Sequence, residues 1–226
     1  MDTGARIHMN TWRRLMTTNT DILTLSQLLS PSFPVGGFAY SHGLETAIKE
    51  GAIRCAATLE AWLSDVLQFG GAQSDAVLLN MAYGGDAVAV DVQARAFASS
   101  AERLKEADLQ GAAFCETVQA VWDIDLGRLC YPVAVGRAAG VMKLDPELST
   151  AMYLQAFIGN LVAAAIRLVP LGQVDGQKVQ RALKPHCATI AKASANATLG
   201  DLHSCTWASD IAAMRHETQY SRVFRS

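Results

Sequence analysis

Two short stretches of the sequence hold side chains that could do chemistry together. His42 and Glu45 lie one helical turn apart, where an imidazole and a carboxylate could share a proton or help to hold a metal ion. His203 and Cys205 are separated by one residue and could bind one ion between them. A protein metal site uses three or four such ligands, so neither pair forms a closed site by itself. A helical metal-binding protein or enzyme that uses one of these pairs is therefore the alternative hypothesis.

Sequence motifs of several enzyme classes are missing. Neither GxxxxGK[ST] nor GxGxxG occurs, so the pair Gly36 and Gly37 does not mark a phosphate-binding loop. The five histidines are dispersed and form no HExxH motif. Ser41 and His42 are adjacent in sequence, and adjacent side chains do not face each other on a helix, so they cannot act there as nucleophile and base. The nucleophile motif GxSxG does not occur. We therefore expect no catalytic residue, no bound cofactor and no resident metal ion.

Composition indicates one globular domain in a reducing compartment. Half of the 226 residues are hydrophobic, enough for one sizeable core, and the formal net charge of -2 gives no global attraction to nucleic acid or anionic membranes. The five cysteines form no CxxC pair, and the N-terminal segment lacks a basic start followed by an apolar run. Arg167 and Pro170 interrupt the most apolar window short of the roughly 20 residues that span a bilayer. We expect a soluble, cytoplasmic protein with no membrane or nucleic-acid partner.

Apolar residues recur with helical spacing along almost the whole chain, and alternating β-branched runs are scarce. This pattern predicts an all-α, single-domain bundle of roughly ten helices over residues 21–226, after a flexible arm at residues 1–20. Three predicted helices follow an N-cap residue, namely Asp21, Thr58 and, for the helix at 176–199, Asp175. The last predicted helix begins at about Ser209. The other predicted helices cover residues 44–49, 75–83, 86–99, 101–122, 131–142 and 145–169.

The helix predicted for residues 145–169 has the clearest start. Asp145, Pro146 and Glu147 place an N-cap, a proline at the first helical position and an early acidic residue in the favoured order. Its apolar residues surround the axis, which predicts a nearly buried central helix about 35 Å long. Its polar members Gln155, Asn160 and Arg167 would need partners, and we interpret them as links between helices of the bundle.

The loop at residues 31–40 is unusual because ten residues include two prolines, two adjacent glycines and three aromatics. This composition is typical of a shaped loop, and loops of that kind often carry function. Its aromatic side chains Phe33, Phe38 and Tyr40 are more often plugs of a hydrophobic core than anchors of an interface, and both interpretations stay open.

The last twelve residues of the sequence, 215–226, contain Tyr220, Phe224 and three arginines. Chain ends usually fray and are rich in small polar residues, whereas aromatic and arginine side chains are enriched at the energetic centres of protein interfaces. The composition of this tail therefore predicts that a partner receives it.

Three segments together carry a resemblance to a known family. They are the loop at 30–45 (SPSFPVGGFAYSHGLE), the stretch from Asn160 through Arg167 to Gln177, and the ending at 215–226 (RHETQYSRVFRS). Their residues, order and spacing resemble those of the urease accessory protein UreF family. The resemblance covers about residues 22–226.

The resemblance implies a dimeric, all-helical scaffold without chemistry of its own, which helps to load nickel into apo-urease. It also implies that the protein bridges the accessory protein UreD or UreH and the nickel-carrying GTPase UreG. The tail would order when UreD or UreH binds, so its deletion would leave the stability of the fold almost unchanged. The absence of a phosphate-loop motif is consistent with a partner of a GTPase rather than the GTPase itself.

Carried over by position, Tyr40 and Arg222 match family positions implicated in docking UreD or UreH, and the middle motif matches the region near the dimer and the GTPase. The partner-binding set that follows is Pro34, Phe38, Tyr40, Glu45, Arg167, Gln173, Asp175, Gln177, His216, Glu217, Tyr220, Arg222, Phe224 and Arg225. The chain departs from the family pattern at Ala76, where a proline is common, and at residues 99–103. These departures leave the family assignment intact, and we propose no detailed contact for Asp75 or Arg103.

Overall fold

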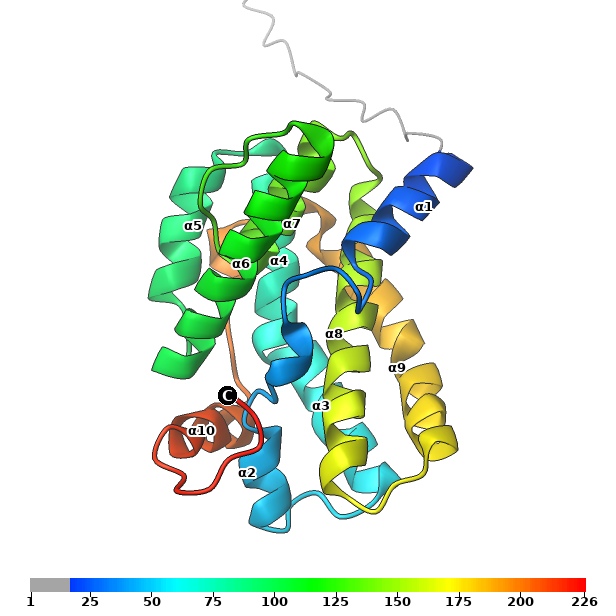
Figure 1. Cartoon of the computed structure of the whole chain (residues 1–226), viewed down its shortest axis with the longest axis vertical. Helices are drawn as coiled ribbons and strands as arrows, with labels where there is room; N and C mark the ends of the chain where they lie inside the picture. Colours follow the sequence, from blue (N-terminus) through cyan, green and yellow to red (C-terminus); the bar gives the residue numbers. More distant parts are fainter. Residues whose placement is uncertain (1–16) are drawn as a thin grey trace, which may run out of the picture.

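Helices make up all the regular structure of residues 17–226, which are the residues that the computed structural model describes (Figure 1). This confirms the prediction of an all-α bundle of about ten helices. They are α1 (Asn19–Leu28), α2 (Leu44–Lys49), α3 (Ala56–Phe69), α4 (Gly71–Gly84), α5 (Ala87–Ala96), α6 (Ala101–Trp122), α7 (Tyr131–Val141), α8 (Pro146–Leu168), α9 (Gln173–Ala193) and α10 (Trp207–His216). Short 3-10 turns lie at η1 (Gly37–Ala39), η2 (Ser194–Asn196) and η3 (Leu199–Asp201). Most of the predicted N-terminal arm, residues 1–16, lies outside the described part.

Two predicted helix starts, those of α1 and α3, were wrong by about one turn for one physical reason. Thr18, not Asp21, is the N-cap of α1, and the Asp21 carboxylate accepts the Thr18 N–H at 2.8 Å from the third helical position. Thr58 likewise sits at the third position of α3 and accepts the N–H of Cys55 at 3.1 Å. In such a capping box the same residue types satisfy both positions, so the sequence alone fits either start. Asp175 also lies inside the first turn of its helix, α9.

Helix α4 starts at Gly71, directly after α3 ends at Phe69, and not at residue 75 as the sequence predicted. Gly70 alone makes the corner between them. A Cβ at Gly70 would overlap the side chain of Thr206, which leads into α10, so this corner requires glycine. Similarly, α10 begins at Trp207, two residues before the predicted Ser209.

Helix α8 packs against several helices of the bundle but is less buried than its sequence predicted, since 39% of its most apolar window is buried. Asp145 accepts the Leu148 N–H at 2.7 Å, and Pro146 is the first helical residue. Helices α4, α7 and α9 pack around α8 (Figure 1). The exposed residues of α8 are Glu147, Ala163 and Arg167. By length and composition α8 could cross a membrane, so our argument that no segment is long enough was wrong. In this fold α8 instead forms the core.

Helices α4 and α7 approach each other most closely. A Cβ at Gly136 would overlap the carbonyl oxygen of Leu79, and one at Gly140 would overlap that of Tyr83. The two backbones are therefore in direct contact, and only glycine fits at these positions of α7. Around them Leu79, Phe114 and Leu154 are fully buried in a hydrophobic core that all layers share.

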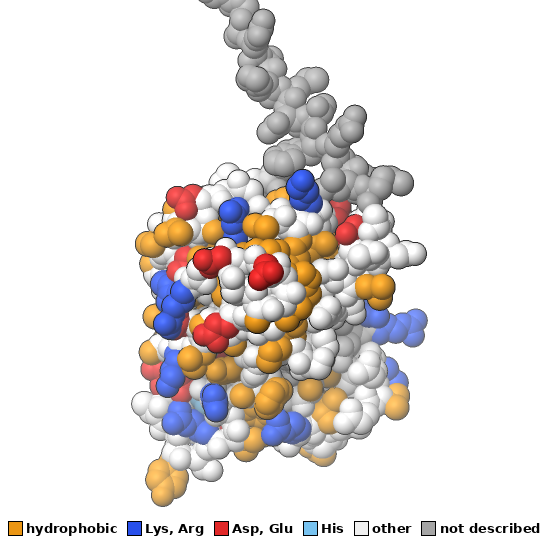
Figure 2. Space-filling view, turned by 45° about the horizontal axis from the view of Figure 1, so that its top comes forward, with side chains coloured by type: hydrophobic (Ala, Val, Ile, Leu, Met, Phe, Trp, Pro, Cys, Tyr) orange, Lys and Arg blue, Asp and Glu red, His pale blue; other side chains and the backbone are white. Residues whose placement is uncertain are grey.

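The surface shows both signs of charge among hydrophobic side chains on the face drawn in Figure 2, in keeping with the formal net charge of -2. Larger side chains that are hydrophobic and exposed occur on α5, α10 and the tail.

Candidate partner-binding site at the C-terminal clasp

The tail folds back onto the loop that precedes α2. Arg225 N–H donates to the carbonyl of Ala39 at 2.8 Å, and Ser41 N–H donates to the carbonyl of Ser226 at 2.8 Å. The Ser41 hydroxyl donates to the same Ser226 oxygen. Figure 1 shows the tail leaving α10 and returning toward η1. We call residues 215–226, the loop 36–45 that receives them and the first turns of α6 the C-terminal clasp.

Glu45 on α2 is the residue that holds the tail. Its buried carboxylate accepts the N–H of Val223 at 2.8 Å, the N–H of Phe224 at 2.9 Å and the side-chain amide of Gln219 at 3.3 Å. Hydrogen bonds to a charged acceptor are about twice as strong as neutral ones, and a carboxylate with several backbone donors fixes their positions. Glu45 therefore sets the path of residues 219–224.

A second set of contacts joins the tail to the start of α6. His216 is fully buried, with Nδ1 2.7 Å from a Glu102 oxygen and Nε2 3.4 Å from a Glu45 oxygen. Arg222 forms an ion pair with the other Glu102 oxygen at 2.6 Å. Glu217 accepts the N–H of Ala101 at 2.8 Å, and so caps α6 from the distant end of the chain. These polar contacts fix the tail relative to α6.

Phe224 is the apolar anchor of the tail. Its ring is buried, and the Arg167 guanidinium on α8 lies 4.8 Å from the ring centroid, a cation–π contact. The structure thus brings Arg167 of the middle motif to the clasp. Gln173 and Gln177 are exposed on the first turns of α9, where Asp175 pairs with Lys178 at 2.9 Å. Within residues 17–226, no hydrogen bond or ion pair joins these three residues to the clasp.

The order of the tail differs from what the resemblance implied. Residues Phe224 and Ser226 are buried without any partner present, so the tail does not need a partner to become ordered. We now expect deletion of the tail to lower the stability of the fold, because it would expose apolar surface and leave the Glu45 carboxylate without its donors. Tyr220 and Arg225, in contrast, are exposed.

The aromatic residues of the loop divide between the two interpretations left open above. Phe33 and Tyr40 are buried, and the Phe33 ring lies 5.3 Å from that of Phe114 in the core. Phe38 is 70% exposed, next to the solvent-exposed Pro34. Two of the three are therefore core residues, and Phe38 is free to contact a partner.

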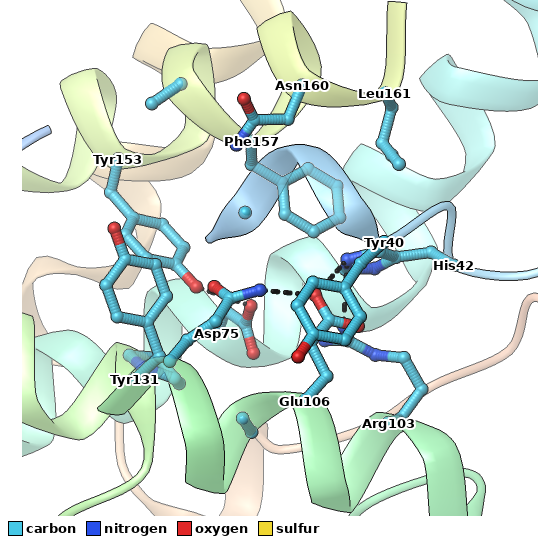
Figure 3. A pocket seen from close by; sticks show the side chains of 15 residues that line it. Tyr40, His42, Asp75, Arg103, Glu106, Tyr131, Tyr153, Phe157, Asn160 and Leu161 are labelled. Carbon is cyan, nitrogen blue, oxygen red and sulfur yellow. Dashed lines mark hydrogen bonds and ion pairs between the residues drawn. The ribbon is translucent and has the colours of Figure 1, made fainter. Parts of the chain in front are cut away.

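A small polar cavity of about 40 Å³ lies beneath the clasp, lined among others by Tyr40, His42, Asp75, Arg103 and Glu106 (Figure 3). Ligand sites for small molecules usually measure about 300–1,000 Å³, so this cavity is far smaller. Its residues come from the loop, α4, α6, α7 and α8, and Asn160 of α8 lies on the wall opposite Glu106.

Glu106 is the most connected residue of the cavity. Its oxygens accept from Arg103 at 2.6 Å, Gln110 at 2.9 Å and the Ser226 hydroxyl at 3.0 Å, and His42 Nε2 lies 2.8 Å away. Burial alone would raise the pKa of Glu106, but the charge of Arg103 and the adjoining His42 more than offset it and lower this pKa to about 2. Glu106 is therefore ionised, and it links the tail to the cavity.

His42 and Asp75 are both shifted toward neutrality by burial. Burial and then the charge of Arg103 lower the pKa of His42. Asp75 accepts the Tyr153 hydroxyl at 2.8 Å, and burial raises its pKa to about 6 despite Arg103. The cavity therefore holds one firmly ionised pair, Arg103 and Glu106, beside two groups, His42 and Asp75, whose pKa values burial shifts toward the neutral form.

The backbone around His42 is strained to place its ring in the cavity. His42 has φ = 54°, which is uncommon for a residue other than glycine, and Gly43 follows with φ = 75°. A Cβ at Gly43 would overlap the backbone of α10 at Ala212 and Ala213. The turn lets α10 approach closely and sets the His42 ring edge-on to Phe157, with centroids 4.7 Å apart.

The structure separates one of the two pairs that the alternative hypothesis used. His42 contacts Glu106, whereas Glu45 lies near His216, so the two do not act together. His203 Nδ1 lies 2.9 Å from the carbonyl oxygen of Asp201. Across the described residues, no group of three or more His, Cys, Asp or Glu side chains is arranged to hold a metal ion.

The sequence did not predict the α6 residues of the site. Glu102, Arg103 and Glu106 are essential to the clasp or the cavity, and we had proposed no contact for Arg103 or Asp75. A signal was present, because positions 103, 106 and 110 continue the buried stripe that Phe114 and Val118 begin on α6. Polar residues on the apolar stripe of a helix require buried partners.

Comparison with known proteins identifies the family to which this fold and clasp belong. The family model for UreF matches residues 53–184, more than half of the chain. A urease accessory protein UreF from Roseobacter denitrificans is 51% identical over 221 residues, covering 96% of this chain and 99% of that protein. The chain belongs to the UreF family. This confirms the resemblance drawn from the three motifs.

Other relatives agree over similar lengths. The urease accessory protein UreF of Ruegeria pomeroyi is 49% identical over 213 residues, which cover 92% of this chain and 98% of the relative. That of a Ruegeria species is 52% identical over 213 residues, covering 92% of this chain and all of the relative. The family model itself ends before the tail, so the full-length relatives extend the likeness beyond residues 53–184.

Proposed function

We propose that this protein is a non-catalytic scaffold of urease maturation in the cytoplasm. It works as a homodimer that bridges the accessory protein UreD or UreH and the GTPase UreG, so that nickel, as cargo, is inserted into apo-urease. Membership of the UreF family supports this role. The observation that carries the partner-binding part is the clasp, where two motifs far apart in the sequence meet and display exposed aromatic side chains.

The clasp suits partner binding because its interior is rigid and its outer side chains are free. Glu45 and Phe224 hold the tail from inside, while Phe38 and Tyr220 are exposed. A preordered surface loses less conformational entropy on binding than a mobile segment, and exposed aromatic and arginine side chains supply the largest contributions at interfaces. We place UreD or UreH on this surface, with Phe38, Tyr220 and Arg222 as its main contacts.

We place the GTPase at the junction of α8 and α9. Gln173 and Gln177 are exposed there, and Arg167 connects this junction to the clasp through Phe224. A partner at either place could therefore influence the other through one side-chain contact. This assignment follows the resemblance of the middle motif.

The proposal is tested by mixing the purified chain with its UreD and UreG counterparts and measuring mass by light scattering after size exclusion. We expect one complex that contains all three proteins. Tyr220→Ala should weaken UreD or UreH binding by about tenfold or more, whereas Val88→Ala on α5, also exposed, should not. Elution as separate components would contradict the proposal, and so would tight one-to-one nickel binding by the isolated chain in a calorimetric titration.

A further inference from the structure

Helix α10 carries its large apolar side chains on its solvent-exposed face instead of on the face that packs against the core. Its buried residues are Ala212, Ala213 and His216. Its larger apolar residues, Trp207, Ile211 and Met214, follow each other at helical spacing and are 74%, 43% and 50% exposed. A surface helix of a monomeric domain normally turns such residues inward.

The small size of the residues on the buried face of α10 has a structural cause. Ala212 and Ala213 lie directly on the backbone at Gly43, where even one added carbon would overlap them. The close approach leaves no room for a larger side chain beneath α10. The core therefore accounts for the small inner face, but it does not account for tryptophan, isoleucine and methionine on the outer face.

The exposed stripe of α10 continues into a groove. A cavity of about 370 Å³ lies between the end of α3 and the start of α10, with walls that include Trp62, Val66, Phe69 and Trp207. Trp207 belongs to both the groove and the stripe. Asp65 is the charged residue of the rim, and among the described residues that line the groove there is no Lys or Arg. We call the groove and the stripe together the α10 surface.

We infer that the α10 surface is a second half of the partner-binding site, covered by the same UreD or UreH subunit that contacts the clasp; this rests on the proposed function. The partner presents to it an apolar face with a Lys or Arg side chain opposite Asp65. Two observations carry this choice of occupant, namely the limited size of the surface and its continuity with the clasp.

The size of the α10 surface indicates that it does not bind a partner alone. A handful of exposed side chains amounts to a few hundred Å² of apolar patch, whereas a stable complex buries about 800 Å² on each partner. The missing area lies directly beside it, because α10 ends at His216 inside the clasp and the fully exposed Tyr220 follows Met214 by six residues. One partner surface can therefore cover both.

The experiment measures the affinity of the full chain for its purified UreD or UreH counterpart by calorimetry. Trp207→Glu, which puts a charge into an apolar contact, should raise Kd at least tenfold, and Asp65→Lys should raise it severalfold through repulsion. The matched control is Val88→Glu, at a position 69% exposed on α5, which should leave Kd within about twofold. Trp207→Ala serves in place of Trp207→Glu if the charged variant melts at a lower temperature.

Two outcomes separate this inference from the proposed function. If Tyr220→Ala weakens binding and Trp207→Glu does not, the partner contacts the clasp only and the inference is wrong, while the proposed function stands. If Tyr220→Ala binds normally, the proposed partner site fails whatever Trp207→Glu does. Should Trp207→Glu instead convert a dimer of the isolated chain into a monomer in light scattering, the α10 surface belongs to a second copy, which also overturns the inference.

Discussion

The contact between α4 and α7 and the C-terminal clasp are held together by opposite means. At Gly136 and Gly140 the two helices touch backbone to backbone, and the interface is apolar and fixed by shape. At the clasp, Glu45, Glu102 and Glu106 bind the tail through hydrogen bonds and ion pairs. The first kind of contact tolerates no change of volume, and the second depends on charge.

This difference explains why partner binding would occur at the clasp. Opening the α4–α7 contact exposes the shared hydrophobic core, so it is expected only with global unfolding. Opening the clasp exposes much less apolar surface, chiefly the Phe224 ring, and exchanges the donors to a few carboxylates for water. The clasp is therefore ordered without a partner but less stable than the bundle, and binding sites are drawn from such regions.

The largest effect should come from the shape-dependent contact. Gly136→Ala places a Cβ on the Leu79 carbonyl oxygen, and we expect it to lower the free energy of unfolding by at least about 3 kcal/mol or to prevent folding. The matched control is Gly159→Ala on α8, where the nearest atom to the new Cβ is a Gln180 side-chain oxygen at 3.6 Å. That variant should be as stable as the parent or slightly more stable. Equal urea midpoints for the two variants would show that α4 and α7 are not in backbone contact.

The second prediction concerns Asp75 in the polar cavity, whose replacement should raise the free energy of unfolding at neutral pH rather than lower it. Burial raises the pKa of Asp75 from 3.8 to about 6, so the folded state holds a proton that the unfolded state has lost between these pH values. Stability from this group is therefore present at low pH and falls as the pH rises through about 6, by up to about 3 kcal/mol. Asp75→Asn keeps an acceptor for Tyr153 and should remove this fall.

The measurement compares urea unfolding of the parent, Asp75→Asn and the exposed control Asp65→Asn at pH 4 and pH 7.5. Asp75→Asn should gain about 2 kcal/mol relative to the parent at pH 7.5 and little at pH 4. Asp65→Asn should follow the parent at both. A gain that is the same at both pH values would mean that the acid does not titrate in this range.

A smaller effect is expected from the residue that holds the tail. Glu45→Gln keeps the volume but replaces one acceptor oxygen by an amide that faces the N–H groups of Val223 and Phe224, so it should cost about 1–2 kcal/mol. Amide hydrogen exchange should increase at residues 219–226 and stay unchanged in α4 and α7. Glu60→Gln, exposed on α3, is the control. Uniformly faster exchange in both regions would show that clasp and bundle unfold together.

Much of the bundle could be predicted from the sequence because its signals are local. The spacing of apolar residues and the order Asp145, Pro146, Glu147 predicted α8 almost to the residue. Capping boxes left the starts of α1 and α3 ambiguous, since Asp21 and Thr58 satisfy the first turn from inside it. These two boundary errors therefore arise because the same residue types satisfy either of two positions in a capping box.

The candidate site was predicted only in part, because its contacts are not local. Glu45 and Arg222 were named through the resemblance, but the partner of Arg222, Glu102, lies 120 positions earlier in the chain. The buried state of Phe224 depends on Arg167 and the loop, which no periodicity connects. Sequence patterns indicate which face of a helix is apolar, and they do not indicate which distant carboxylate will meet a tail.

Replacing Arg222 should have the smallest effect on stability, and it tests most directly whether a clasp residue serves the fold or the partner. Its ion pair with Glu102 is partly solvent-exposed, so Arg222→Ala should lower the free energy of unfolding by less than about 1 kcal/mol. If Arg222 is also an anchor for UreD or UreH, the same change should weaken binding by about 2 kcal/mol, or roughly thirtyfold. Urea unfolding and calorimetry on one sample measure both quantities. A loss of stability as large as the loss of affinity would mean that Arg222 serves the fold, and unchanged affinity would remove it from the partner-binding set.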